Sequence, residues 1–222
     1  MSAAKTSKVC KSVMQNINST INALREKNLT RDEKGISQTT ATDNITYITY
    51  SGKNSSSSIM LDKHISSSHL IDVLLENQQY NVLLYDKSIL QAEFTVCRDT
   101  IIKERLVFIK KHNKIWTDEE IMQNEALDID WFSEEDSIPI FIRIDYAPED
   151  HKECQHPAVH CTLSNHEPCR IPIKSIVSFS SFVHFILLHF YDIDLPLSEY
   201  KFSQDDTITA LEKKMIHFSW DE

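Results

Sequence analysis

Four stretches of the chain place apolar residues every three or four positions, which is the spacing of one helix face. The first, with Val9, Val13, Ile17, Ile21 and Leu24, predicts an amphipathic helix over residues 7–28. The others are a helix that Ser66 or Ser67 would cap, with Leu70 and Leu74; a helix over residues 178–191; and a closing helix marked by Ile208, Leu211, Met215 and Phe218. Because residues 178–191 are apolar on nearly every side, we expect that helix to be buried.

From residue 80 onward the apolar positions follow a period of two, as in strands with one buried face. The predicted strands span residues 82–85, 88–97, 101–110, 138–146, 158–164 and 169–174, after an isolated strand at 45–50. No crossover helix fits between consecutive strands, which excludes a parallel α/β sheet. We therefore predict an α+β fold with an antiparallel meander sheet of about five to seven strands and with helices at both chain ends packed on one face.

Two stretches fit neither pattern. Residues 30–58 are polar and serine-rich apart from the strand at 45–50, and they are predicted to be a loop region. Residues 117–136 hold nine acidic residues and no lysine or arginine. No internal repeat or domain boundary is visible, so residues 1–222 are predicted to fold as a single domain.

The acidic segment 117–136 also carries large apolar side chains, among them Ile121, Met122, Trp131 and Phe132. An acidic run of this kind is usually a solvated loop. Aromatic residues and methionine are nevertheless enriched at the centres of protein interfaces, and acidic neighbours would attract a basic partner. These four residues are therefore candidates for binding a protein partner.

Composition narrows the classes of function. The 33 acidic and 23 basic residues give a net charge of −10, which disfavours nucleic acid or an anionic membrane as the main ligand. Only two glycines are present, which excludes the glycine-rich loops that hold nucleotide phosphates and the GxSxG motif of hydrolases, and no cofactor is expected. Five cysteines, no spanning apolar run and no apolar signal core predict a cytoplasmic protein with reduced thiols.

Residues 145–170 concentrate titratable side chains, with four of the ten histidines and three of the five cysteines. Alternation along the strands places the charged residues on the sheet face opposite the apolar ones. That polar face is predicted to carry Gln91, Glu93, Arg105, Arg143, Asp145, His160 and Arg170. It is the candidate site that the sequence offers.

The polar face allows three interpretations. It can be a structural ion-pair network, in which Asp145 binds arginines and His160 bonds a backbone carbonyl. It can instead be a metal-independent ribonuclease site, since histidine can move protons and arginine can stabilise phosphate charge. The candidate catalytic residues are then His160, Arg170, Arg143, Asp145, Tyr146 and His156.

Zinc binding is the third interpretation, because cysteine and histidine are its preferred ligands. No metal site is predicted, since Cys161 and Cys169 fall on the apolar face of the hairpin. In addition, His156 and His160 would lie roughly 13 Å apart in an extended chain unless it bends at Pro157.

Six short motifs carry a resemblance to a known family. They are Leu84-Tyr-Asp-Lys-Ser-Ile-Leu-Gln, Lys103-Glu-Arg-Leu, Arg143-Ile-Asp-Tyr, His156-Pro-Ala-Val-His, Cys169-Arg-Ile-Pro and Phe185-Ile-Leu-Leu-His-Phe-Tyr. In this order they resemble an uncharacterised bacterial family catalogued as domain of unknown function 2290. The chain departs from the family pattern at Lys87, where a turn glycine is usual, and at Glu104, where a basic or histidine residue would fit. The resemblance implies a prokaryotic cytoplasmic protein, suggests a defence or toxin–antitoxin type module, and supplies no established activity.

The function expected from these observations is a non-catalytic protein-binding or accessory component. The acidic surface, the missing phosphate loops and the acidic segment with aromatic residues favour it. The ribonuclease is the alternative from another class. A basic cleft around Arg143 and Arg170 would favour the nuclease, whereas a neutralised face would favour the binding protein. The sequence leaves the oligomeric state open.

Overall fold

The structure, a computed structural model, describes residues 7–41, 44–51, 67–110, 140–163, 169–197, 202 and 206–219. The acidic segment 117–136, with the candidate anchors Ile121, Met122, Trp131 and Phe132, lies outside these ranges. Residues 52–66 of the serine-rich tract also lie outside them. The role predicted for the four anchors therefore stays a prediction.

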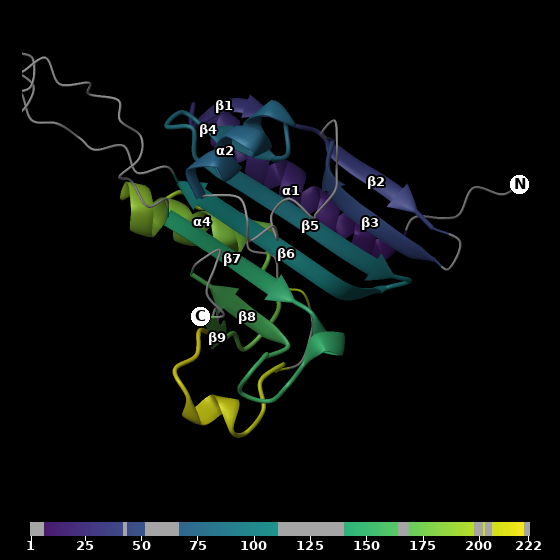
Figure 1. Ribbon diagram of the computed structural model, residues 1–222. Helices are drawn as coiled ribbons and strands as arrows, with labels where there is room; N and C mark the ends of the chain where they lie inside the picture. The colour runs from purple at the N-terminus through teal and green to yellow at the C-terminus, as the bar shows by residue number, and fades with distance from the viewer. Residues whose placement is uncertain are drawn as a thin grey trace, which may run out of the picture.

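In the part of the chain that the structure describes, nine strands form one antiparallel sheet, and the predicted α+β fold is confirmed (Figure 1). The strands are β1 (Thr30–Glu33), β2 (Ile36–Thr40), β3 (Ile45–Tyr50), β4 (Val82–Leu84), β5 (Ile89–Cys97), β6 (Thr100–Lys110), β7 (Ile140–Tyr146), β8 (Val159–Thr162) and β9 (Arg170–Pro172). Their order is β1-β4-β5-β6-β7-β8-β9, while β3 also pairs with β5, and β2 pairs with β3. From β4 to β9 each strand pairs with the next along the chain, as a meander requires.

Helices cover both faces of this sheet. The two long helices near the chain ends, α1 (Lys8–Glu26) and α4 (Phe179–Tyr191), pack on the same face, as predicted, and form the larger core with it. A serine caps each of them: Ser7 Oγ accepts the N–H of Cys10 and Ser178 Oγ accepts that of Ser181, both at 3.1 Å. The shorter helix α2 (Ser67–Glu76) packs on the opposite face with a second, smaller core (Figure 1).

Two predictions of secondary structure are wrong within the described residues. The closing helix does not form; residues 212–214 make only a 3₁₀ turn, η4 (Glu212–Lys214), and Phe218 pairs as a parallel bridge with Ile173 beside β9. Leu211 and Met215, which helical spacing placed in the core, are exposed. Residues 30–40 were predicted to be a loop, but β1 and β2 lie in this range. Both are edge strands, and edge strands can form without an apolar alternation that would mark them in the sequence.

The turn between β4 and β5 accounts for one departure from the family pattern. Lys87 has a φ of 66°, in the left-handed region that favours glycine. Its N–H still donates to the carbonyl of Leu84 at 3.0 Å, and Asp86 Oδ1 accepts the N–H of Ser88 at 3.0 Å. The hydrogen bonds of the turn therefore form with a lysine at this position.

Candidate functional site

Strand register aligns four titratable side chains in one row across the sheet. From β5 to β8 the row consists of Glu93, Arg105, Asp145 and His160, each directly opposite the next. Because antiparallel partners on one face lie about 5 Å apart, neighbouring members of the row can interact. We call these four residues the charged row.

A second row lies one step along the same face. It holds Arg143 on β7, Thr162 on β8 and Arg170 on β9. The structure thus brings Arg143 and Arg170 beside the charged row, as the alternation of the strands predicts. Tyr146 does not join them. It lies opposite Glu104 and packs against the larger core on the other face, so its place in a shared site is corrected.

Asp145 is held between two arginines. Its Oδ1 accepts a hydrogen bond from Arg105 Nε at 2.8 Å, and its Oδ2 accepts one from Arg143 Nε at 2.5 Å. The three side chains are only 8–12% exposed. Burial alone would raise the pKa of Asp145, but the two guanidinium groups outweigh it and hold the pKa below the usual range. The carboxylate is therefore ionised, and each of its oxygens accepts a hydrogen bond from a guanidinium group.

Glu93 is the second carboxyl group of the row. Burial raises its pKa, while Arg105 across the strand and a hydrogen bond from the Tyr50 hydroxyl act in the opposite direction. Two carboxyl groups, Glu93 and Asp145, thus face the two guanidinium groups of Arg105 and Arg143. This part of the polar face is compensated in charge and does not form a basic cleft.

His160 is buried at the end of the charged row. Its Nδ1 lies 2.9 Å from the carbonyl oxygen of Pro157, which can only accept, so Nδ1 carries the proton. Its Nε2 is 3.8 Å from Asp145 Oδ2, too far for a hydrogen bond. Burial lowers the pKa of His160 to about 4, although Asp145 acts to raise it. The ring is therefore neutral at pH 7, and the predicted bond to a backbone carbonyl is present.

His156 lies against His160 rather than far from it. The ring centroids are 4.7 Å apart with planes at 71°, because the chain bends before Pro157. A tight turn makes the bend: the N–H of His156 donates to the carbonyl of Lys152 at 2.7 Å, and that of Lys152 donates back at 2.9 Å. Burial, followed by the nearby Arg170, lowers the pKa of His156. Both histidines of the pair thus favour the neutral form.

Glu212 fixes the loop that carries this histidine pair, and the sequence reading missed it. Its Oε1 accepts the N–H of Cys154 at 3.1 Å and lies 3.4 Å from His151 Nε2. Its Oε2 accepts the N–H of Thr209 at 2.9 Å, and Thr209 Oγ1 accepts the N–H of Glu212 at 3.2 Å. This reciprocal pair is a capping box, and the spacing Thr-x-x-Glu was the signal that could have found it.

Glu104 is a buried carboxyl group on the apolar face. It is fully buried, and neither side-chain oxygen has a hydrogen-bond partner among the described residues. Burial raises its pKa well above the usual range, and the nearby Val177 backbone offsets this only in part. Burial therefore favours the protonated form of Glu104. It stands where the family pattern favours a basic or histidine residue, so this chain differs there in charge as well as in shape.

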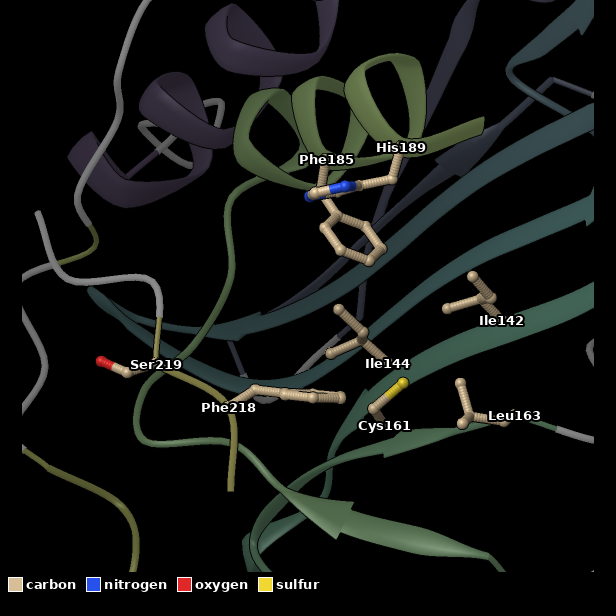
Figure 2. Close-up of a pocket in the computed structure, with 8 residues that line it drawn as sticks. All are labelled: Ile142, Ile144, Cys161, Leu163, Phe185, His189, Phe218 and Ser219. Atoms are coloured by element: carbon tan, nitrogen blue, oxygen red, sulfur yellow. The ribbon is translucent and has the colours of Figure 1, made fainter. Parts of the chain in front are cut away.

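An apolar cavity of about 330 Å³ lies on the face opposite the charged row. It is lined by Ile142, Ile144, Cys161, Leu163, Phe185, His189, Phe218 and Ser219. In Figure 2, Phe185 and His189 lie on the side of α4 that faces β7, Cys161 lies on β8 with Leu163 just after that strand, and Phe218 closes one side. Burial raises the pKa of Cys161 to about 12, so it is an inert thiol at neutral pH. The alternation of the strands placed Ile142, Ile144, Cys161 and Leu163 on the apolar face, but the sequence did not predict a cavity.

The described residues offer no metal site. No three histidine, cysteine, aspartate or glutamate side chains among them lie close enough together to hold an ion. Cys161 and His160 are neighbours in sequence but point to opposite faces of β8. Among the described candidate ligands, the rings of His156 and His160 are in contact, and Arg170 lies near this pair.

The fold and site define an α+β protein with an antiparallel sheet, a compensated charged row on one face and an apolar cavity on the other. A family model described as an uncharacterized conserved protein (DUF2290) matches residues 29–220, which is most of the chain. The protein therefore belongs to this family. No curated protein and no solved structure matches the chain. None of the described helices is long and apolar enough to cross a membrane.

Proposed function

We propose that this protein is a non-catalytic protein-binding or accessory component of the bacterial cytoplasm. The observation that carries the proposal is the compensation of charge on the polar face. Asp145 binds both Arg105 and Arg143, and its lowered pKa makes it a weak base. His160 has a pKa of about 4 and its proton on Nδ1 is committed to Pro157. A general acid or base works best with a pKa near the working pH.

The apolar cavity is the docking site in this proposal. Its volume of about 330 Å³ is at the lower end of the range for ligand pockets, and nearly all its lining is apolar. Leu163 at its rim is 47% exposed. We assign to it one large aromatic or aliphatic side chain from a protein partner, because such anchors in desolvated pockets dominate binding energy. The net charge of −10 favours a partner with basic residues around that anchor.

The ribonuclease stays the alternative because of one residue. Arg170 is half-buried in the second row, beside His156, and no ion pair with another described residue engages it. A phosphate could bind there without displacing a carboxylate. Membership of a defence or toxin–antitoxin type module is a further part of the proposal that follows from the family resemblance alone.

A matched pair of variants tests the docking site. Leu163→Glu places a charge at the cavity rim, whereas Leu211→Glu does so at a leucine that is 49% exposed and does not line the cavity. The tagged wild type should recover a stoichiometric partner from native cells, and the purified partner should bind the Leu211→Glu protein normally. Leu163→Glu should weaken binding at least about tenfold, which corresponds to about 1.4 kcal/mol. Equal binding by both variants would exclude the cavity.

The same preparation tests the alternative. Purified wild type, alone and with the recovered partner, is incubated with RNA, and the cleavage products are compared with those of His160→Ala and Arg170→Ala. We expect the RNA to stay intact. Cleavage by the wild type that either substitution abolishes would establish the ribonuclease and refute the non-catalytic function.

A further inference from the structure

The strands β1 and β2 follow each other along one edge of the sheet. The first pairs with β4 and the second with β3, and β3 and β4 both pair with β5. The β1 half of the edge carries Arg31, Asp32 and Glu33 in four residues. The β2 half, Ile-Ser-Gln-Thr-Thr, has no charge and no proline. Charged residues and proline are the usual means by which an edge strand avoids pairing with another chain.

The hydrogen bonds to β3 show which backbone groups of β2 point outward. The N–H of Ala41 donates to Ile45 at 2.8 Å, and the N–H of Ser51 donates to Gly35 at 2.7 Å. In an antiparallel pair the bonded positions alternate, so the odd-numbered positions of β2 bond β3. The N–H and C=O groups of Ile36, Gln38 and Thr40 therefore point away from the sheet. Gln38, Thr39 and Thr40 are exposed.

The opposite edge of the sheet is protected. The strand β9 has only three residues and ends at Pro172, which has no N–H to offer. The next residue, Ile173, is paired with Phe218 of the C-terminal segment. In the described part of the chain, β2 is thus the edge strand that lacks these protections.

We infer that β2 pairs antiparallel with β2 of a second copy of this chain, about a two-fold axis that passes beside Gln38. In this register Gln38 lies opposite Gln38 and Ile36 lies opposite Thr40, so each outward N–H meets an outward carbonyl. The side chains suit the arrangement, since β-branched residues lie opposite each other and no like charges meet. The charged β1 strands of the two copies lie at opposite ends of this interface.

The interface between the two β2 strands is small, so it should form only under certain conditions of concentration and salt. Two five-residue strands bury less than the roughly 1,200 Å² of a stable interface, so a weak, concentration-dependent dimer is expected. The net charge of −10 on each copy adds a repulsion that salt screens. Self-association should therefore strengthen with salt, whereas an ion-paired interface would weaken.

Sedimentation velocity of the full chain tests the inference over about 5–500 µM protein at low and moderate salt. Wild type should shift from monomer toward dimer as concentration and salt rise. Gln38→Pro removes an outward donor without removing a bond to β3, and Gln38→Lys places two like charges on the axis, so both should stay monomeric. Arg31→Gln, on the charged half of the edge, should dimerise as wild type does.

Circular dichroism and thermal melting test whether each variant is folded. If Gln38→Pro is unfolded, Gln38→Lys alone tests whether β2 forms the dimer interface. A wild type that stays monomeric at every concentration would overturn the inference. So would a dimer that both Gln38 substitutions leave intact. Binding of a different protein that is lost with Gln38→Lys, from a monomeric wild type, would assign the edge to that partner and equally overturn self-pairing.

Discussion

Replacing Asp145 by asparagine measures what the charged row contributes to the stability of the fold. The side chain of Asp145 is 8% exposed, and those of its two partners, Arg105 and Arg143, are 11% and 12% exposed. Asparagine keeps nearly the same shape, so the substitution removes the charge with little change in packing. It leaves two buried guanidinium groups without the carboxylate that they share.

The size of the effect follows from these contacts. A pair of unit charges about 4 Å apart attracts by about 4 kcal/mol at an effective dielectric constant of about 20, and Asp145 faces two such partners. The measured loss is smaller, because the guanidinium groups regain some water and the amide oxygen still accepts one bond. Removing one partner of a buried pair costs about 3–5 kcal/mol, and we expect about 4 kcal/mol here. With an m value of about 2–3 kcal/mol per molar urea, the midpoint falls by about 1.5 M.

Urea unfolding at pH 7, followed by circular dichroism, gives the midpoint. The matched control is Asp194→Asn, because Asp194 also forms an ion pair, with His184 at 3.1 Å, but the two side chains are 80% and 42% exposed. That control should lose no more than about 1 kcal/mol. Adding Arg143→Met to Asp145→Asn removes one unpaired charge and should recover part of the loss. If Asp145→Asn is no less stable than the control, the charged row is not a stabilising network.

The acid side of the stability curve gives an independent check. The pKa of Asp145 is lower in the folded state than its ordinary value of 3.8. Its contribution is therefore complete above that ordinary pKa and is lost as the pH falls through the folded pKa. The difference between wild type and Asp145→Asn should be constant from pH 6 to 8 and should shrink on acidification. A difference that grows toward low pH would contradict the assignment.

Three further predictions concern the other buried groups. The pKa of Glu104 is raised in the folded state, so its contribution to folding stability is complete below pH 4.5 and is lost as the pH rises through the folded pKa. Wild type should therefore lose stability between pH 5 and 8 relative to Glu104→Gln. Urea unfolding should show a loss of at most about 1.4 kcal/mol per pH unit. The imidazole of His160 should titrate by NMR near pH 4, and a midpoint near 6.5 would show that it is not buried as described. Glu212→Ala should cost about 2 kcal/mol and speed hydrogen exchange at the amides of Cys154 and Thr209, whereas unchanged exchange there would exclude the clamp.

Period-two alternation was enough to predict the face of most residues of β5 to β9, but not of Ile101, which a register shift in β6 places in the larger core. It could not predict the rows. A slip of two residues keeps every side chain on its face but changes its neighbour, so parity leaves open whether Arg105 meets Asp145 or another residue of β7. The pairing depends on turn geometry and on packing between distant parts of the chain. The contact of His156 with His160 has the same origin, since a turn and not a strand joins them.

Other parts of the fold gave no signal or a misleading one. The residues of β2 are mostly exposed, so no apolar alternation marks the strand. Near the C-terminus, Ile208, Leu211, Met215 and Phe218 follow helical spacing, but only Ile208 is buried there. The segment is anchored by Glu212 and by strand-like pairing of Phe218 with Ile173, which are contacts distant in sequence. Periodicity reports burial of a local face and cannot report an anchor of this kind.

Consecutive residues of β8 belong to the charged row and to the cavity, so the effects of substitutions on folding stability and on partner binding can be measured separately. His160 ends the charged row on one face, and the next residue, Cys161, lines the cavity on the other. If the row stabilises the fold and the cavity binds a partner, Asp145→Asn should lower the urea midpoint yet leave partner affinity in native buffer within about twofold, because the side chains of the two sites lie on opposite faces of the sheet. Leu163→Glu should do the reverse, since a half-exposed residue tolerates a charge. Loss of both properties in either variant would mean that the two faces act as one site, and the division of roles argued from the strand would fail.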